Sequence, residues 1–332
     1  MKLLYYSLIA LSIVFLSACS SSGSSGEEDI GDVRPTLRLN FDKFISSRTS
    51  INGETGEVTC SATDEILVFV HETGSQPVTV AEWLKCRHKF ITDNNNCRHN
   101  RFSEITGTSA PLTLNPGKTY TWYVMYPYTE AVKSPMGHGT IVVTDQEQIG
   151  NQNTSQMSKH AIMTGVKLDA KSEQEIAISL KQRMTFMHFK VQNEKNEEFV
   201  PKYLELSTEG NPPATLRGEF QVDFKNGLTA IQTQNKLRLN LQNMDAVPVG
   251  GHMDVYAIMA PFSLKTNDVF NVQVVTDISN TTQTTQIREN KNFEAGKFYT
   301  TNVKVTSLSV YANINPWEVQ EEMEEDLHLD DK

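Results

Sequence analysis

Residues 120–126 read Tyr-Thr-Trp-Tyr-Val-Met-Tyr, and four of these seven side chains are aromatic. β-Branched and aromatic residues favour strands, because their side chains pack well on a pleated surface. Gly117 precedes the run and Pro127 follows it, and both residue types commonly mark turns. We therefore predict a strand here. Its Trp122 and Tyr126, with Tyr128 just beyond, are expected to fill a core rather than form a sugar-stacking platform.

Similar segments recur along the whole chain. They are four to eight residues long and are bounded by Gly, Pro, Asn or Asp, as strands commonly are. They lie at residues 65–70, 140–143, 175–180, 186–191, 202–206, 255–259, 272–275 and 301–305. Only residues 80–85 and 155–163 carry weak helical signals. The pattern predicts a mainly β fold of sandwich type.

The length of the chain suggests two domains, since about 300 residues follow residue 30. A polar stretch at residues 167–173 lies near the middle and precedes a new set of strands. We therefore predict two tandem β-sandwich domains, at residues 34–170 and 171–311. An acidic tail at residues 312–332 would follow them.

The charge of the chain argues against some partners. It has 40 acidic and 30 basic residues, for a net charge of −10. Nucleic acids and anionic membrane surfaces are bound by concentrated basic faces. We therefore expect neither to be a partner.

The N-terminal residues have the pattern of a secretory signal. A basic start leads into a short apolar run that closes on Leu16-Ser17-Ala18-Cys19. A cysteine after such small residues resembles the bacterial lipoprotein pattern, in which acyl chains, palmitate among them, attach to the cysteine. We predict a signal peptide at residues 1–18, lipidation of Cys19 and a flexible Ser/Gly-rich tether at residues 19–33. An ordinary cleaved signal with an incidental Cys19 is the alternative.

Two Cys-x-His pairs flank an Asn-rich turn, Cys86-Arg87-His88 and Cys97-Arg98-His99. In an oxidising compartment Cys86 and Cys97 can form a disulfide across a hairpin, and a disulfide or two free thiols is the favoured interpretation. Zinc ligation by Cys86, His88, Cys97 and His99 is the weaker alternative, because their spacing matches no common zinc signature.

Catalytic motifs do not stand out. The histidines lack HExxH spacing, and neither a Gly-x-Ser-x-Gly motif nor a phosphate-binding loop is present. We therefore expect a protein that is not an enzyme and needs no cofactor.

Several motifs occur in an order that resembles the fimbrillins, the lipoprotein-derived pilus subunits of Bacteroides-type bacteria. They are Ser47-Arg48-Thr49-Ser50 with Gly53, the segment from Glu57 to Ile66, Gly117-Lys118-Thr119-Tyr120, the segment Asn153–Met163, Gly296-Lys297-Phe298-Tyr299 and Pro316-Trp317-Glu318. Cys60 stands where family members often have Trp. The resemblance covers nearly the whole mature chain and implies two transthyretin-like Greek-key sandwich domains.

The resemblance also implies a route of assembly. An arginine-specific protease would cut between Arg48 and Thr49, and the first strand would leave an apolar groove for a strand of the next subunit. The lipid-anchored, surface-exposed precursor at the cell outer membrane would thus become a pilus subunit that serves adhesion. In the alternative interpretation, Arg48 is simply a solvated residue.

Both ends of the folded region bear on this exchange. Val33, Leu37, Leu39 and Phe41 are spaced to share one face of a strand. Near the other end, residues 309–317 alternate and are more apolar than the acidic tail, so they are the favoured donor strand. Other pilus subunits and the maturation protease are therefore the expected partners. A surface glycan-binding lipoprotein and a non-cleaved tip or anchor subunit are the alternatives.

Overall fold

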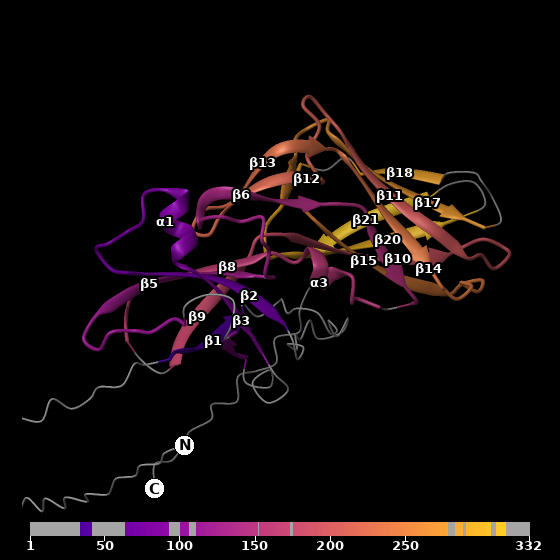
Figure 1. Ribbon diagram of the computed structural model, residues 1–332. Coiled ribbons are helices and arrows are strands. Elements are labelled where there is room, and N and C mark those ends of the chain that lie inside the picture. Colours follow the sequence, from indigo (N-terminus) through magenta and orange to yellow (C-terminus); the bar gives the residue numbers. More distant parts are fainter. Residues whose placement is uncertain are drawn as a thin grey trace, which may run out of the picture. The chain divides into compact units, whose positions relative to one another are not determined.

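The computed structural model describes residues 34–41, 64–92, 100–105, 111–151, 153–172, 175–277, 283–287, 290–306 and 310–316 (Figure 1). All of these residues belong to one compact unit of the chain. Strands dominate the described part, which otherwise contains two short helices, α1 (Val80–Lys85) and α3 (Met157–His160). The prediction of a mainly β fold is confirmed.

Seven strands close into a barrel in the order β1-β4-β3-β2-β5-β8-β9. Their bounds are β1 (Thr36–Phe41), β2 (Glu65–Glu72), β3 (Arg87–Ile91), β4 (Arg101–Glu104), β5 (Thr119–Tyr126), β8 (Met163–Lys171) and β9 (Glu175–Gln182). The sequence pattern predicted a sandwich for this half of the chain. The sheet closes instead because β1 pairs with both β4 and β9 and leaves no edge between them.

Aromatic side chains fill the barrel. Trp122 and Tyr126 of β5 are fully buried, together with Phe90 of β3 on the same face of the sheet. Tyr128 is half-buried, and Lys89 Nζ lies 4.6 Å from the centre of its ring. The predicted core packing is therefore confirmed for Trp122 and Tyr126.

The remaining strands form four further sheets. A four-stranded sheet has the order β15 (His252–Met259), β10 (Thr185–Asn193), β20 (Phe298–Val305) and β21 (Val310–Pro316). A five-stranded sheet has the order β18 (Gln283–Ile287), β17 (Val269–Thr276), β11 (Pro201–Glu209), β14 (Lys236–Gln242) and β7 (Gln146–Ile149). The two smaller sheets are β13 (Gly227–Gln234), β12 (Arg217–Asp223) and β6 (Met136–Val143), and the pair β16 (Phe262–Leu264) and β19 (Lys291–Phe293).

The four- and five-stranded sheets share a second hydrophobic core. Phe189 of β10 belongs to the same buried cluster as Leu204 of β11, Leu239 of β14 and Val272 of β17. Side chains from two sheets that face one cluster are typical of sandwich packing.

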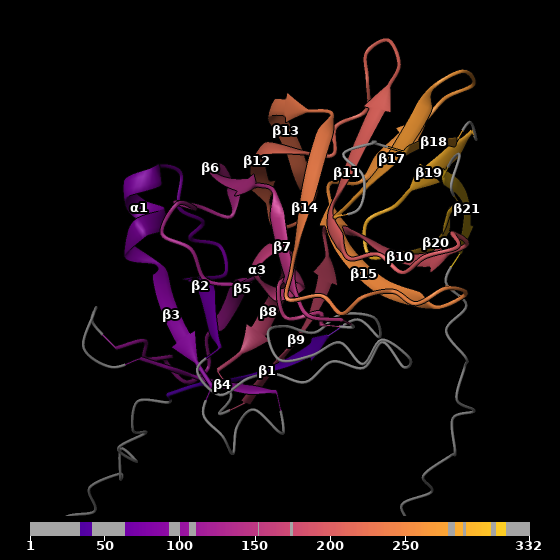
Figure 2. The same cartoon turned by 90° about the vertical axis from the view of Figure 1, so that its right-hand side faces the viewer.

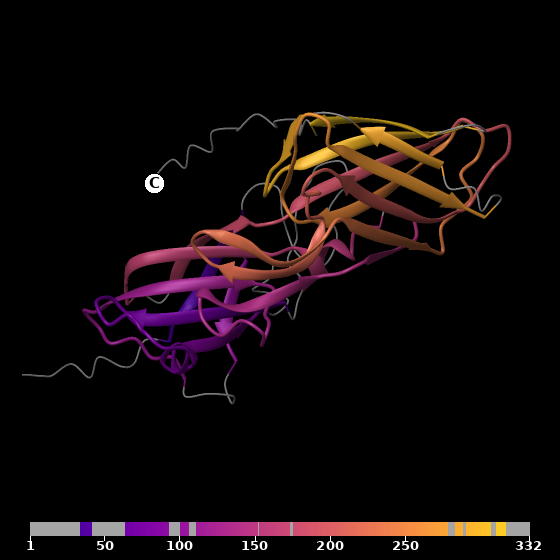
Figure 3. The same cartoon turned by 90° about the horizontal axis from the view of Figure 1, so that it is seen from above.

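Strands from the two halves of the chain are interleaved. β7 lies between the barrel strands β5 and β8 in sequence, yet it pairs in parallel with β14 (Figure 2). Conversely, the β12–β13 hairpin pairs with β6, and Figure 3 shows this orange hairpin beside the magenta strand. The boundary predicted between residues 170 and 171 falls at the end of β8, and both β8 and the following strand β9 belong to the barrel. The domain limits themselves stay a prediction.

The two Gly-Lys-x-Tyr segments form equivalent turns. Gly117 and Gly296 have φ angles of 78° and 74°, which glycine adopts without the strain of a Cβ atom. In the first turn the Asn115 N–H donates to Tyr120 Oη at 2.8 Å. In the second the Glu294 N–H donates to Tyr299 Oη at 3.0 Å. Each tyrosine thus fixes the turn that leads into its own strand.

Candidate strand-exchange site

β1 lies between β4 and β9 in the barrel wall (Figure 2). It pairs with β9 in parallel over six residues, from Thr36 with Glu175 to Phe41 with Leu180. It pairs with β4 in antiparallel fashion over three residues. A strand with neighbours on both sides is an internal part of the wall, and its removal would leave two unpaired edges.

The apolar side chains of β1 point into the barrel. Leu37 and Leu39 are both 0% exposed. Arg38 lies between them and Asn40 follows them, and both of these side chains are exposed. Phe41 is half-buried. The predicted common face is confirmed for Leu37 and Leu39, and Val33 lies outside the described residues.

The walls of the β1 position are also apolar. Leu37 is the register partner of Phe102 on β4 and of Ile176 on β9, and Leu39 is the partner of Ile178. All three partners are buried. Full burial of one leucine stabilises a fold by roughly 1.5–3 kcal/mol, so β1 contributes substantially to the barrel.

An ion pair crosses the outer face of β1. Arg101 Nε of β4 lies 2.6 Å from Glu175 Oε2 of β9, and both side chains are more than a third exposed. Sequence reasoning missed this pair, because its members are 74 residues apart and are neighbours only through the pairing of β1. The two strands that flank β1 are thus joined over it.

β21 is the other strand to which the sequence assigned a part in exchange. The predicted segment, residues 309–317, contains β21, which pairs with β20 over seven residues. In the described part of the chain β20 is the partner on one side, and β21 ends the four-stranded sheet. An edge strand can be replaced without breaking a second ladder.

Several predicted site residues lie outside the described part of the chain: Cys19, Arg48, Thr49, Cys97 and His99. Lipidation of Cys19, cleavage between Arg48 and Thr49 and the disulfide between Cys86 and Cys97 therefore stay predictions.

Cys86 and His88 are described. Cys86 is half-buried after α1, and burial raises the pKa of its thiol. His88 Nδ1 lies 2.7 Å from Glu104 Oε1. Among the described residues, no group of three or more His, Cys, Asp or Glu side chains could hold a metal ion.

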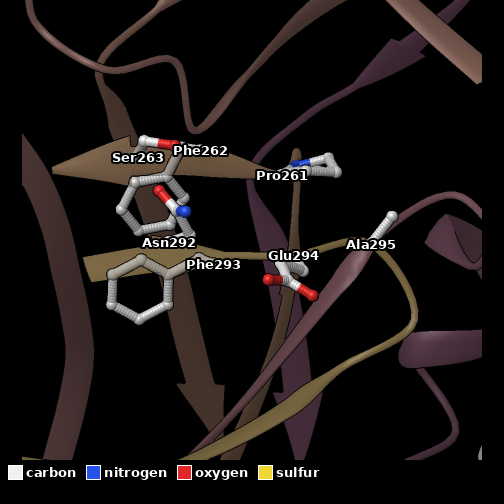
Figure 4. Close-up of a pocket in the computed structure, with 7 residues that line it drawn as sticks. All are labelled: Pro261, Phe262, Ser263, Asn292, Phe293, Glu294 and Ala295. Carbon is white, nitrogen blue, oxygen red and sulfur yellow. The ribbon is translucent and has the colours of Figure 1, made fainter.

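Two adjoining hollows lie beside β16. The first has a volume of about 340 Å³ and is drawn in Figure 4, where the rings of Phe262 and Phe293 lie next to each other. These rings stack, with centres 4.2 Å apart. The second hollow, of about 490 Å³, shares Pro261, Phe262, Ser263 and Ala295 with the first. We call the second one the Arg183 hollow, because Arg183 lines it.

Two solved structures have a β-rich fold similar to that of this chain. A candidate cell adhesion protein from Bacteroides ovatus is 16% identical, with a TM-score of 0.58, and the match covers 88% of this chain and 100% of that one. A candidate cell adhesion protein from Bacteroides uniformis is 10% identical, with a TM-score of 0.55, and the match again covers 88% and 100%. At these identities the likeness concerns the fold alone.

The family is established by a match over most of the sequence. The fimbrillin-like family model matches residues 50–317, and the chain therefore belongs to the fimbrillin-like family. The resemblance inferred from the sequence motifs is confirmed. No curated protein matches the chain. In the described residues, no helix is both long and apolar enough to span a membrane.

Proposed function

We propose that the protein is a structural subunit of a pilus that serves adhesion. It is exported as a lipoprotein acylated at Cys19 and is anchored at the outer membrane, exposed on the cell surface. An arginine-specific protease then cuts between Arg48 and Thr49. The lipid and β1 both precede this cut, so they leave together, and a strand of the next subunit takes the place of β1.

The position of β1 carries this proposal. β1 is internal to the barrel wall, its two leucines are fully buried, and the proposed cut follows its last residue, Phe41, by seven residues. Loss of β1 would expose the apolar side chains of Phe102, Ile176 and Ile178 and the main-chain groups of β4 and β9. Such a slot offers a strand both hydrogen bonds and pockets for alternate side chains.

β21 is the proposed donor. It ends its sheet in the described part of the chain, and the acidic residues follow it. Acidic side chains are poorly suited to an apolar slot, because an unpaired carboxylate costs several kcal/mol to bury. The tail would therefore stay in solvent while the preceding strand is exchanged.

Proteolysis of the purified protein tests the cleavage step. We expect an arginine-specific protease to produce a new N-terminus at Thr49, as read by N-terminal sequencing. Arg48→Lys should resist the cut, whereas the matched variant Arg38→Lys on the exposed face of β1 should be cut normally. A product that starts anywhere else would rule out cleavage at Arg48.

Peptide binding tests the exchange step separately. A labelled peptide of residues 309–317 should bind the cleaved protein in a fluorescence polarisation assay and should not bind the intact protein. Equal binding to both forms would contradict exchange at the β1 position, even if cleavage occurs as proposed. A subunit that is cut but takes no strand would instead fit a terminal role in the pilus.

The aromatic residues of β5 do not support the alternative of a glycan-binding lipoprotein. Trp122 and Tyr126 are fully buried and form no platform for a sugar.

A further inference from the structure

The Arg183 hollow contains an arginine whose position is fixed by three acceptors. Its Nε donates to Thr164 Oγ1 at 2.7 Å, and its Nη2 donates to the carbonyl oxygens of Phe224 at 2.8 Å and Lys225 at 3.3 Å. Its Nη1 has no hydrogen-bond partner among the described residues. The guanidinium is therefore held in place with one terminal nitrogen available.

The charge of Arg183 is not neutralised by a nearby carboxylate. The structure contains no ion pair to Arg183 within the described residues, and burial lowers the pKa of the guanidinium. Asp223 raises the pKa of Arg183 electrostatically without forming an ion pair, and its carboxylate accepts the N–H groups of Lys225 and Asn226 in the β12–β13 turn. The guanidinium therefore has neutral hydrogen-bond acceptors but no carboxylate in direct contact, and an anionic ligand can supply that charge.

A second cation lines the same hollow. Lys265 is exposed, and its amine makes no ion pair in the described structure. The one acidic residue in the lining, Asp268, accepts the Lys265 backbone N–H through Oδ2 at 2.9 Å. Two unpaired cations thus face one carboxylate that already has a partner.

The rest of the lining combines apolar and neutral polar groups. Pro212, Pro213 and Pro261 contribute flat apolar surface, and Ser263 and Asn226 contribute polar side chains that can bond hydroxyl groups. Prolines have no N–H, so these segments are poorly suited to hold a peptide through main-chain bonds. A volume of about 490 Å³ lies in the range of small-molecule sites.

We infer that the Arg183 hollow binds an anionic saccharide, with its carboxylate or sulfate group at Arg183 Nη1 and Lys265. The hydroxyl groups of the sugar bond Ser263 and Asn226, and its C–H face packs on the prolines. A second sugar ring extends into the adjoining hollow, which shares Ser263. Glu294 lines that hollow, so the charged group of the ligand lies at the Arg183 end.

Gly227 lies in the turn next to Arg183. Its φ of 107° is a backbone conformation that side chains rarely adopt, so glycine suits this turn. A Cβ atom there would lie 3.6 Å from Arg183 Nη1, at ordinary van der Waals distance.

This inference goes beyond the proposed structural role, and its test does not require strand exchange. Calorimetric titration of the intact protein would use galacturonate and galactose 6-sulfate as anionic probes and galactose as the neutral one. We expect both anions, or one of them, to bind at least about tenfold more tightly than galactose, since hydrogen bonds to charged groups are stronger than those to neutral groups. The anion that binds more tightly shows whether the hollow prefers a carboxylate or a sulfate group.

Variants distinguish the site from general charge effects. Arg183→Gln and Lys265→Gln should each weaken anion binding about tenfold, whereas Lys236→Gln, an exposed lysine on β14, should leave it unchanged. Because Arg183→Gln removes bonds to Thr164 and Phe224, Ser263→Trp provides a second check. It fills the hollow from an exposed position and should abolish binding with the fold intact by circular dichroism.

The inference would be overturned by equal affinity for galactose and both anions, by unchanged binding in Lys265→Gln and Ser263→Trp, or by the absence of heat with all three sugars. Displacement of the bound sugar by triglutamate at equal concentration would also overturn it, because the hollow would then be a site for acidic peptides.

Discussion

Arg101 Nε lies 2.6 Å from Glu175 Oε2, and the two residues belong to the strands on either side of β1. Their register partners on β1 are Arg38 and Thr36, so the pair spans the outer face of this strand. The same strand is held from inside the barrel by Leu37 and Leu39. β1 is therefore retained by burial on one face and by an exposed ion pair on the other.

Loss of the ion pair should loosen β1 slightly. We expect Arg101→Ala or Glu175→Ala to lower the free energy of unfolding by about 0.2–1 kcal/mol, because exposed pairs contribute little. Urea denaturation measures this change, and hydrogen exchange at the amides of β1 should increase. Lys118→Ala is the matched control, since it removes the similarly exposed pair with Glu72 away from β1. Faster exchange of β1 in the control as well would contradict a specific role for Arg101.

Loss of a buried leucine of β1 should cost far more. We expect Leu39→Ala to lower the free energy of unfolding by about 2–5 kcal/mol, because it leaves a cavity among packed side chains. Asn40→Ala, on the exposed face of the same strand, should change it by less than about 0.5 kcal/mol. Equal effects in denaturant unfolding would show that β1 does not pack as the barrel requires.

A glutamine side chain joins β7 to the neighbouring sheet. Gln146 is buried, its Nε2 donates to the Ile258 carbonyl oxygen, and its Oε1 accepts the Ile258 N–H at 3.0 Å. Gln148 repeats the pattern, donating to the Asp254 carbonyl oxygen at 2.9 Å and accepting the Tyr256 N–H at 2.9 Å. The edge of β15 is therefore satisfied by side chains rather than by another strand.

Substitution of Gln146 should lower the free energy of unfolding. Gln146→Leu keeps the volume similar but leaves the buried Ile258 N–H and carbonyl unpaired, at a cost of about 1–3 kcal/mol for each group. Thermal and urea unfolding should both detect the loss. Glu147→Leu, whose exposed side chain bonds Gln242, provides the control and should be nearly neutral. Equal stability of Gln146→Leu and wild type would mean that water replaces the amide at β15.

The strands with clear alternation could be predicted from the sequence. Every strand-like segment identified there lies within a strand of the structure, and residues 80–85 form α1. β7 was missed because its sequence, Gln-Glu-Gln-Ile, is mostly polar, and two of its side chains replace main-chain pairing. β13 was missed because most of its residues are exposed on both faces, so it has no apolar period.

Closure of the barrel and the candidate sites could not be predicted for a different reason. β1 and β9 pair across more than 130 residues of sequence, and local pattern does not encode such a choice of partner. The acceptors of Arg183 likewise come from β8 and from the residues after β12, which only the fold brings together. Sequence reasoning identified the apolar face of β1 but not the strands that bind it.

The first turn of α1 predicts a pH dependence. Glu82 Oε2 accepts the backbone N–H groups of Val78 at 2.7 Å and Thr79 at 3.1 Å, and these bonds lower the pKa of Glu82 below its usual 4.5. A carboxyl with a lower pKa in the folded state stabilises the fold above its unfolded pKa, and this contribution is lost as the pH falls through the folded pKa. Stability should therefore decrease below about pH 4.5 in part through Glu82. NMR titration of the Glu82 carboxyl carbon should give a midpoint below 4.5, and Glu82→Gln should show a weaker loss of stability in acid. A midpoint at or above 4.5 would mean that this cap is not formed in solution.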